Sequence, residues 1–355
     1  MNLGALLASP QNSFNTMRLV AAIAVVVSHS SLLVWGFYPL SWGPYDLGAL
    51  AVNVFFFISG LMLSRSFELN PDWRRFAVAR MLRIFPGLLV AGVLVGWVLT
   101  PFYTARPFAD YLLDPRTLFY PLTSTLELDA IQPRGVFPDS TQPGEIGLPL
   151  WTIKYELLAY LVFGAASAAG IFRSKRTALL LCALFGLALT VTDATGLLNG
   201  SPLGSVIRFG FAFLLGVSAY RYRAAIVIRP WLGLALAAAA LVLTATFAGP
   251  IAWTLAACCA AVLLAGVELP RITVFTRRTD LSFGIYIYAW PVQQALMSVE
   301  WMRGNFVLHA LVALAISAVL AWLSWTLIEK PALSLKQGVR AAPRPVLAAE
   351  REPAS

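Results

Sequence analysis

Residues 14–36 of the chain read FNTMRLVAAIAVVVSHSSLLVWG, an apolar run that contains one arginine, Arg18, and one histidine, His29. A run of this length can cross the hydrocarbon core of a bilayer as one α-helix. Arg18 and His29 are eleven residues apart, which is about three helical turns and about 16 Å of rise, so both lie on nearly one face. Ionisable groups are costly in lipid unless they are paired or face water, so this face is expected to point into a helix bundle.

Similar apolar runs recur along the chain. Of its 355 residues, 59% are hydrophobic and 12% are charged, which is more apolar side chain than a water-soluble protein can bury. The pattern predicts an all-α polytopic membrane protein with about ten transmembrane helices. Residues 1–336 are expected to form one transmembrane domain and residues 337–355 a disordered cytoplasmic tail. The expected spans are 14–36, 49–66, 84–101, 149–172, 177–195, 204–220, 231–248, 251–269, 281–299 and 305–328.

Basic residues indicate the orientation of these spans. Lys and Arg cluster in alternate connections, and the opposite connections contain few of them. The net charge of +9 therefore indicates a membrane protein, expected with both termini in the cytoplasm, and not a nucleic-acid-binding protein. The clusters assigned to the inner side are Arg74, Arg75, Arg80 and Arg83; Arg173, Lys175 and Arg176; Arg221, Arg223 and Arg229; and Arg271, Arg277 and Arg278.

The cysteines and the long outer connection carry weaker signals. Cys182, Cys258 and Cys259 fall inside apolar spans, so they are expected to be core residues and not disulfide partners or metal ligands. The connection from Phe102 to Leu148 is interrupted by proline and is expected to be neither a span nor a regular helix. It is either a lid or binding segment or a plain solvated connector.

His29 is the first candidate for chemistry. A neutral imidazole inside an apolar helix can act as general base toward a hydroxyl group. The alternative is an imidazole that is hydrogen-bonded to a neighbouring helix, and the alignment with Arg18 favours the catalytic interpretation. His309, the other histidine, lies near the outer end of the last span and is expected to be interfacial and structural.

Further charged residues lie at the ends of spans. Arg80 and Arg83 share a helical face, which suits a phosphate-bearing ligand, although without other motifs charge that orients the helix is the favoured explanation. Glu156 lies two residues after Lys154 in an apolar span. It is expected to orient the imidazole or bind sugar hydroxyls, or else to form a charge pair or reach the interface. An interfacial position accounts for Arg208 and Glu329.

Taken in order, these segments resemble the acyltransferase-3 family of bacterial membrane O-acyltransferases. Leu61 and Ala289 depart from the family pattern, and the second departure concentrates proton chemistry on His29. The similar segments are the Arg18 and His29 pair, residues 53–61 (NVFFFISGL), 80–86 (RMLRIFP), 149–151 (PLW) with Glu156, 281–286 (LSFGIY) through Trp290 and Pro291, and 328–331 (IEKP).

The resemblance implies a single-domain enzyme that transfers an acyl group from cytoplasmic acyl-CoA to a carbohydrate hydroxyl, without a metal. It implies acetyl-CoA as the usual donor and succinyl-CoA as the alternative, while the acceptor and the oligomeric state stay open. The rival is a membrane transporter or flippase for a glycan intermediate, which would also need buried charge. His29 is implied as base or acyl carrier and Glu156 as its catalytic partner, and the implied substrate-binding residues are Arg18, Arg80, Arg83, Ser59, Trp151, Tyr155 and Glu329.

Overall fold

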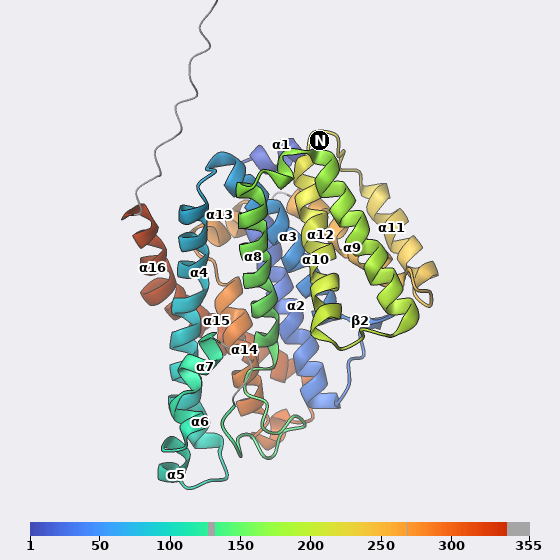
Figure 1. The fold of residues 1–355 in the computed structure, drawn as a ribbon. Helices are drawn as coiled ribbons and strands as arrows, with labels where there is room; N and C mark the ends of the chain where they lie inside the picture. The colour runs from blue at the N-terminus through green and yellow to red at the C-terminus, as the bar shows by residue number, and fades with distance from the viewer. Residues whose placement is uncertain (127–131, 268, 339–355) are drawn as a thin grey trace, which may run out of the picture.

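Long apolar helices make up most of the chain in a computed structural model that describes residues 1–126, 132–267 and 269–338 (Figure 1). Within these residues, six helices are long and apolar enough to cross a membrane, or seven if the bent pair α12 and α13 counts as one span. The chain is therefore an all-α multi-pass membrane protein, and the expected number of ten spans stays a prediction. The six are α2 (Phe14–Trp35), α3 (Leu47–Leu69), α4 (Trp73–Val93, continued to Tyr103), α9 (Lys175–Thr195), α10 (Pro202–Arg221) and α15 (Phe306–Ser324, continued to Ser334).

Shorter elements complete the bundle. The other helices are α1 (Leu3–Ala8), α5 (Phe108–Leu112), α6 (Pro115–Leu118), α7 (Tyr120–Leu126), α8 (Ile153–Ala168), α11 (Pro230–Leu243), α12 (Gly249–Ala265), α13 (Pro270–Arg278), α14 (Ser282–Leu296) and α16 (Lys330–Ser334). Two short strands, β1 (Ser41–Trp42) and β2 (Tyr45–Asp46), form a hairpin between α2 and α3.

Helix α4 begins earlier than the sequence pattern predicts. It starts at Trp73 and not at residue 84, because the Asp72 carboxylate caps the helix by accepting hydrogen bonds from the Arg74 and Arg75 amides at 2.9 and 3.2 Å. The apolar window missed this start because the first turns of α4 are basic. Arg80 and Arg83 consequently belong to a helix of the bundle and not to a connection.

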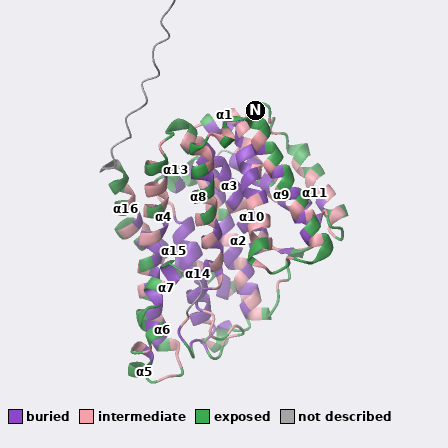
Figure 2. Ribbon diagram, viewed as in Figure 1, coloured by how far each residue is buried: buried purple, intermediate pink, exposed green. Residues whose placement is uncertain are grey.

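Helix α14 forms the centre of the half of the bundle that contains α2 and α15. Every residue from Ser282 to Ala295 is buried, and Figure 2 shows this concentration of buried residues around α14 and α15. A helix buried all round has no lipid-facing stripe. Polar groups on α14 are therefore available only to neighbouring helices and to internal cavities.

Helices α3 and α10 approach closely through two glycines. A Cβ atom at Gly60 would overlap the carbonyl oxygen of Phe213, and one at Gly216 would overlap the carbonyl oxygen of Phe57. Small residues permit such backbone contact in membrane helices. The crossing fixes α10, and with it Arg208, against α3.

The outer connection is partly helical and is held against the bundle. Three short helices, α5, α6 and α7, lie within it, which the sequence pattern did not indicate, and residues 127–131 lie outside the described chain. The Gln294 amide donates to the carbonyl oxygens of Gln142 and Glu145 at 2.8 Å, and Thr141 donates to that of Leu33 at 2.9 Å. These bonds attach the connection to α14 and α2.

The basic clusters assigned to one side of the membrane gather at one end of the bundle, near α1 and α13 in Figure 1. Glu68, at the end of α3, pairs with Arg221 and Arg223 at 3.3 and 2.7 Å. Arg221 also donates to the carbonyl oxygen of Arg173 at 2.5 Å. The orientation of both termini stays a prediction. In the expected tail, residues 337–338 end a 3₁₀ turn and residues 339–355 lie outside the described chain.

Candidate active site

His29 lies on α2 and lines a cavity of about 200 Å³ that it shares with Asp46, Trp151 and Arg208. Its imidazole packs edge-on against Trp290, with ring centroids 5.2 Å apart and an interplanar angle of 80°. Within the part of the chain that the structure describes, no side chain or carbonyl is hydrogen-bonded to this imidazole. The ring is thus held by packing, and its nitrogens are not committed to a neighbouring helix.

His309 contrasts with His29. Its side chain is fully buried, so the interfacial position expected for it is wrong. Its Nδ1 lies 3.1 Å from Ser30 Oγ and its Nε2 lies 3.1 Å from the carbonyl oxygen of Gln293. Both ring nitrogens are used to join α15 to α2 and α14, which is the structural role that the sequence predicts.

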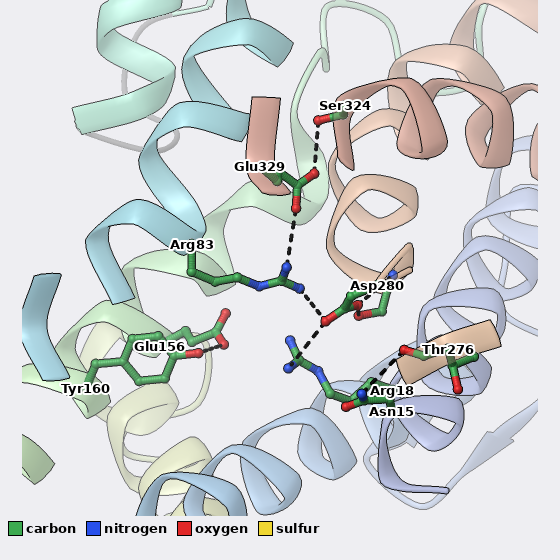
Figure 3. Close-up of polar contacts among 10 residues, drawn as sticks. Asn15, Arg18, Arg83, Glu156, Tyr160, Thr276, Asp280, Ser324 and Glu329 are labelled. Carbon is green, nitrogen blue, oxygen red and sulfur yellow. Dashed lines mark hydrogen bonds and ion pairs between the residues drawn. The ribbon is translucent and has the colours of Figure 1, made fainter. Parts of the chain in front are cut away.

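Arg18 lies further along α2 and belongs to a cluster of opposite charges (Figure 3). The Arg83 guanidinium is bound to Asp280 at 2.6 Å and to Glu329 at 3.4 Å, and Arg18 lies 4.0 Å from the same Asp280 oxygen. Glu329 also accepts a hydrogen bond from Ser324 at 2.9 Å. Arg18, Arg83 and Glu329 therefore come together as predicted site residues, and Glu329 is fully buried, not interfacial.

Glu156 lies apart from His29. It accepts a hydrogen bond from Tyr160, whose ring lies under the Arg80 guanidinium at 5.9 Å from the ring centroid. Glu156 lines a cavity of about 40 Å³ with Arg18 and Ser59, whereas His29 lines the cavity of about 200 Å³. We name them the inner and the outer cavity after the orientation that the sequence predicts. The carboxylate is thus not placed to orient the imidazole, and its catalytic role stays a prediction.

The inner and outer cavities share one wall. Val52, Thr152 and Tyr286 line both of them. Thr152 Oγ1 lies 2.5 Å from Tyr286 Oη, and Tyr286 Oη donates to the carbonyl oxygen of Pro149 at 2.8 Å. A few side chains and one hydrogen-bonded pair therefore separate the Arg18 cavity from the His29 cavity.

Tyr155, like Arg80, Arg83 and Glu329, is a predicted site residue that lines neither cavity. It packs against Trp151 and Phe209, with ring centroids 5.7 and 5.5 Å apart, and borders a separate apolar cavity. Trp151 itself lines the outer cavity and Ser59 the inner one. Tyr155 thus supports the aromatic wall behind Trp151.

The sequence patterns missed Asp46, Arg208 and Asp280 as site residues. Asp46 caps α3 and lines the outer cavity, and its Oδ1 accepts from the Gly48 and Ala49 amides and from Ser28 Oγ. Arg208 was expected at an interface. It lies on α10 inside the bundle, where it donates hydrogen bonds to Asn53 and Ala49 of α3. The sequence did contain one signal for these residues, because a charged side chain in or near an apolar span costs free energy unless it is paired or faces water.

The described residues contain no group of three or more His, Cys, Asp or Glu side chains that could hold a metal ion.

This arrangement places two cavities, with His29 in one and Arg18 in the other, inside a membrane helix bundle. The class of the protein follows from comparison with known families. The model of the acyltransferase domain family matches residues 11–326, so the chain belongs to this family of acyltransferases, as the sequence motifs predict.

The chain is similar to two curated proteins over nearly their whole lengths. It is 28% identical to the O-acetyl transferase of Shigella phage Sf6 over 328 residues, which is 90% of this chain and 95% of the relative. It is 29% identical to nodulation protein 10 of Rhizobium leguminosarum bv. viciae over 374 residues, which is 92% of this chain and 94% of the relative. No solved structure matches.

Proposed function

We propose that this acyltransferase takes a short acyl group from cytoplasmic acyl-CoA and transfers it, across the inner membrane, to a hydroxyl of a cell-envelope or exported carbohydrate. Acetyl is the expected group, in keeping with the name of the phage relative. The observation that carries the proposal is the pair of cavities along α2, one lined by Arg18 and the other by His29, with a shared wall at Thr152 and Tyr286.

The donor enters from the Arg18 side in this proposal. The end of the bundle that holds the basic clusters attracts the phosphates of CoA, and Arg80 adds a cation that forms no ion pair within the described chain. The thin pantetheine arm then passes the wall formed by Val52, Thr152 and Tyr286. Arg18 and Arg83 are held by carboxylates, so their main effect is to shape this entrance.

The acceptor hydroxyl meets the thioester in the outer cavity. Trp151 and Tyr38 supply aromatic walls, and Asp46 and Arg208 supply hydrogen-bonding groups, which is a suitable lining for a sugar. In one route, His29 removes the proton of the hydroxyl while the hydroxyl oxygen attacks the acyl carbonyl carbon. In the other route, His29 itself carries the acyl group before the transfer. Packing against Trp290 keeps the imidazole oriented in both routes.

The test is transfer of radiolabelled acetyl from acetyl-CoA to envelope glycan in membranes that contain the wild type, His29→Ala or His309→Gln at equal abundance. His309→Gln is the matched control because His309 is the other histidine and is not among the residues that line the cavity. We expect incorporation by the wild type and the control, and loss in His29→Ala. Equal incorporation by all three would remove His29 from the chemistry, and no incorporation by the wild type would refute acetyl-CoA as donor.

A second measurement separates the two roles of His29. Wild-type protein incubated with labelled acetyl-CoA, without acceptor, is denatured and its peptides are analysed for a label on His29. A labelled imidazole identifies an acyl carrier, whereas an unlabelled protein with full transfer activity identifies a general base.

A further inference from the structure

Arg208 occupies an unusual position for a cation in a membrane bundle. It lies on α10, where its Nε donates to Asn53 Oδ1 at 2.9 Å and its Nη2 donates to the carbonyl oxygen of Ala49 at 2.8 Å. The guanidinium also stacks near Tyr45 and Phe209, at 4.4 and 5.1 Å from the ring centroids. Hydrogen bonds and rings together fix the charge in one orientation.

This fixed charge lacks an ion pair. Arg83 contacts two carboxylates, but Arg208 contacts none among the residues that the structure describes. Asp46 is the acid that shares its cavity, and Asp46 Oδ1 is bound to the Gly48 and Ala49 amides at the start of α3. A partly buried guanidinium held by neutral groups is stabilised when negative charge arrives beside it.

The arriving charge is defined by the reaction. Arg208 and His29 line the same cavity of about 200 Å³, so a reacting acyl group in it lies near both side chains. Attack of a hydroxyl on a thioester places a full negative charge on the former carbonyl oxygen. A preorganised donor in a water-poor site is the most effective way to stabilise that charge, because it needs no rearrangement during the reaction.

We propose that Arg208 is the oxyanion-stabilising residue of the transfer step, an inference that rests on the proposed function and adds a catalytic group to it. In the direct route, the acceptor oxygen bonds to the acyl carbon, the C=O pair moves onto the oxygen beside Arg208, and His29 takes the hydroxyl proton. The pair then returns, the C–S bond breaks, and the CoA thiolate takes the proton from His29. Atoms and charges balance without a further reactant.

Recognition of a carboxylate on the acceptor is the competing use of this cation. The two uses differ in what they require of the acceptor. An oxyanion forms with any hydroxyl, so Arg208 is needed for a neutral sugar and an acidic sugar alike. A carboxylate-binding residue is needed only when the acceptor carries that carboxylate.

The experiment measures kcat and KM for acetyl-CoA with envelope glycan and with the same glycan after its carboxyl groups have been reduced to alcohols. The proteins are wild type, Arg208→Gln, Arg208→Lys and Arg303→Gln, compared at equal abundance and with their unfolding temperatures. Arg303→Gln is the matched control, because Arg303 is bound to the carbonyl oxygen of Met297 and lies outside the lining of the cavity.

We expect Arg208→Gln to lower kcat about 10²–10³-fold on both glycans, with KM for acetyl-CoA little changed. Arg208→Lys, which keeps the charge but not the fork of donors, recovers part of the rate, and Arg303→Gln behaves as wild type. If the Gln variant does not fold, the folded Arg208→Lys variant is compared with the wild type instead: a lowered kcat on both glycans is expected, and a wild-type kcat overturns the assignment.

When the Gln variant folds, three results overturn the assignment. They are an unchanged kcat in Arg208→Gln, a folded Arg208→Lys with no gain over Gln, and a defect that disappears on the carboxyl-reduced glycan. An inactive wild type refutes the proposed donor or acceptor instead, so failure of the proposed function is distinguished from failure of the role of Arg208.

Discussion

Replacement of Asp280 by Asn tests whether the ion cluster of Arg18, Arg83, Asp280 and Glu329 stabilises the bundle. Asp280 binds Arg83 at 2.6 Å and lies 4.0 Å from Arg18, so its carboxylate separates two cations (Figure 3). Asn fills nearly the same volume and can still accept one hydrogen bond. The substitution therefore removes the charge with little change in packing.

The expected loss follows from the geometry. A hydrogen bond between charged groups contributes about 1.5–3 kcal/mol, and breaking a buried ion pair costs about 3–5 kcal/mol. The Arg18 and Asp280 side chains are 22% and 17% exposed, which places the loss at the lower end. Glu329 continues to neutralise Arg83 from 3.4 Å. The free energy of unfolding should therefore fall by about 3 kcal/mol.

The assay is unfolding of the purified protein in mild detergent, followed by tryptophan fluorescence, for wild type, Asp280→Asn and Asp110→Asn. Asp110 is exposed in the outer connection, so the same substitution there should leave the unfolding transition unchanged. A transition of Asp280→Asn within about 1 kcal/mol of wild type would refute the reasoning, because an exposed ion pair contributes only that much.

Three further changes test other parts of the structure. Gly60→Ala should lower the free energy of unfolding by at least about 3 kcal/mol, because the new Cβ overlaps the α10 backbone. Gly304→Ala, with no atom near its Cβ, is the control, and equal unfolding temperatures would contradict the close crossing. Val52 lines both cavities, so Val52→Phe should obstruct the route between them and lower the transfer rate at least about tenfold. Val20→Phe, on the exposed face of α2, should leave the rate unchanged. Equal rates for the two variants would place the acyl route elsewhere. In the outer connection, the hydrogen bond from Arg106 lowers the pKa of Asp114 below its ordinary value of 3.8. The ion pair between Arg106 and Asp114 is therefore fully present above pH 3.8 and is lost as the pH falls through the lowered pKa of Asp114. Asp114→Asn should increase pepsin cleavage of the outer connection at mildly acidic pH. An unchanged digestion pattern would show that the ion pair does not stabilise the connection.

The sequence was sufficient to predict features that depend on the geometry of a single helix. The alignment of Arg18 with His29 follows from helical periodicity, and the structure places both on α2 facing internal cavities. The family follows from ordered motifs and is confirmed by the match over residues 11–326. These inferences need no knowledge of which helices are neighbours.

What the sequence could not predict depends on neighbours. Asp280 and Arg83 are separated by nearly two hundred residues, and nothing in either segment indicates their 2.6 Å contact. Arg208 resembles an interfacial cation until α3 is seen to supply Asn53 and the carbonyl oxygen of Ala49. Glu156 is a similar case, because its sequence position allowed several roles and only the structure shows that it accepts a hydrogen bond from Tyr160.

The contacts between neighbouring helices also explain how the charged groups differ between the inner and the outer cavity. At the inner end Arg18, Arg83, Asp280 and Glu329 are joined into a network, and such contacts largely cancel one another's fields. At the outer end Asp46 is held by the first amides of α3, and Arg208 is held by the carbonyl oxygen of Ala49 and the side chain of Asn53 on the same helix. One helix thus fixes both charges without letting them pair. Separated, oriented charges beside an uncommitted imidazole favour charge development in the outer cavity, which is why the transfer step is assigned there and donor entry to the other end.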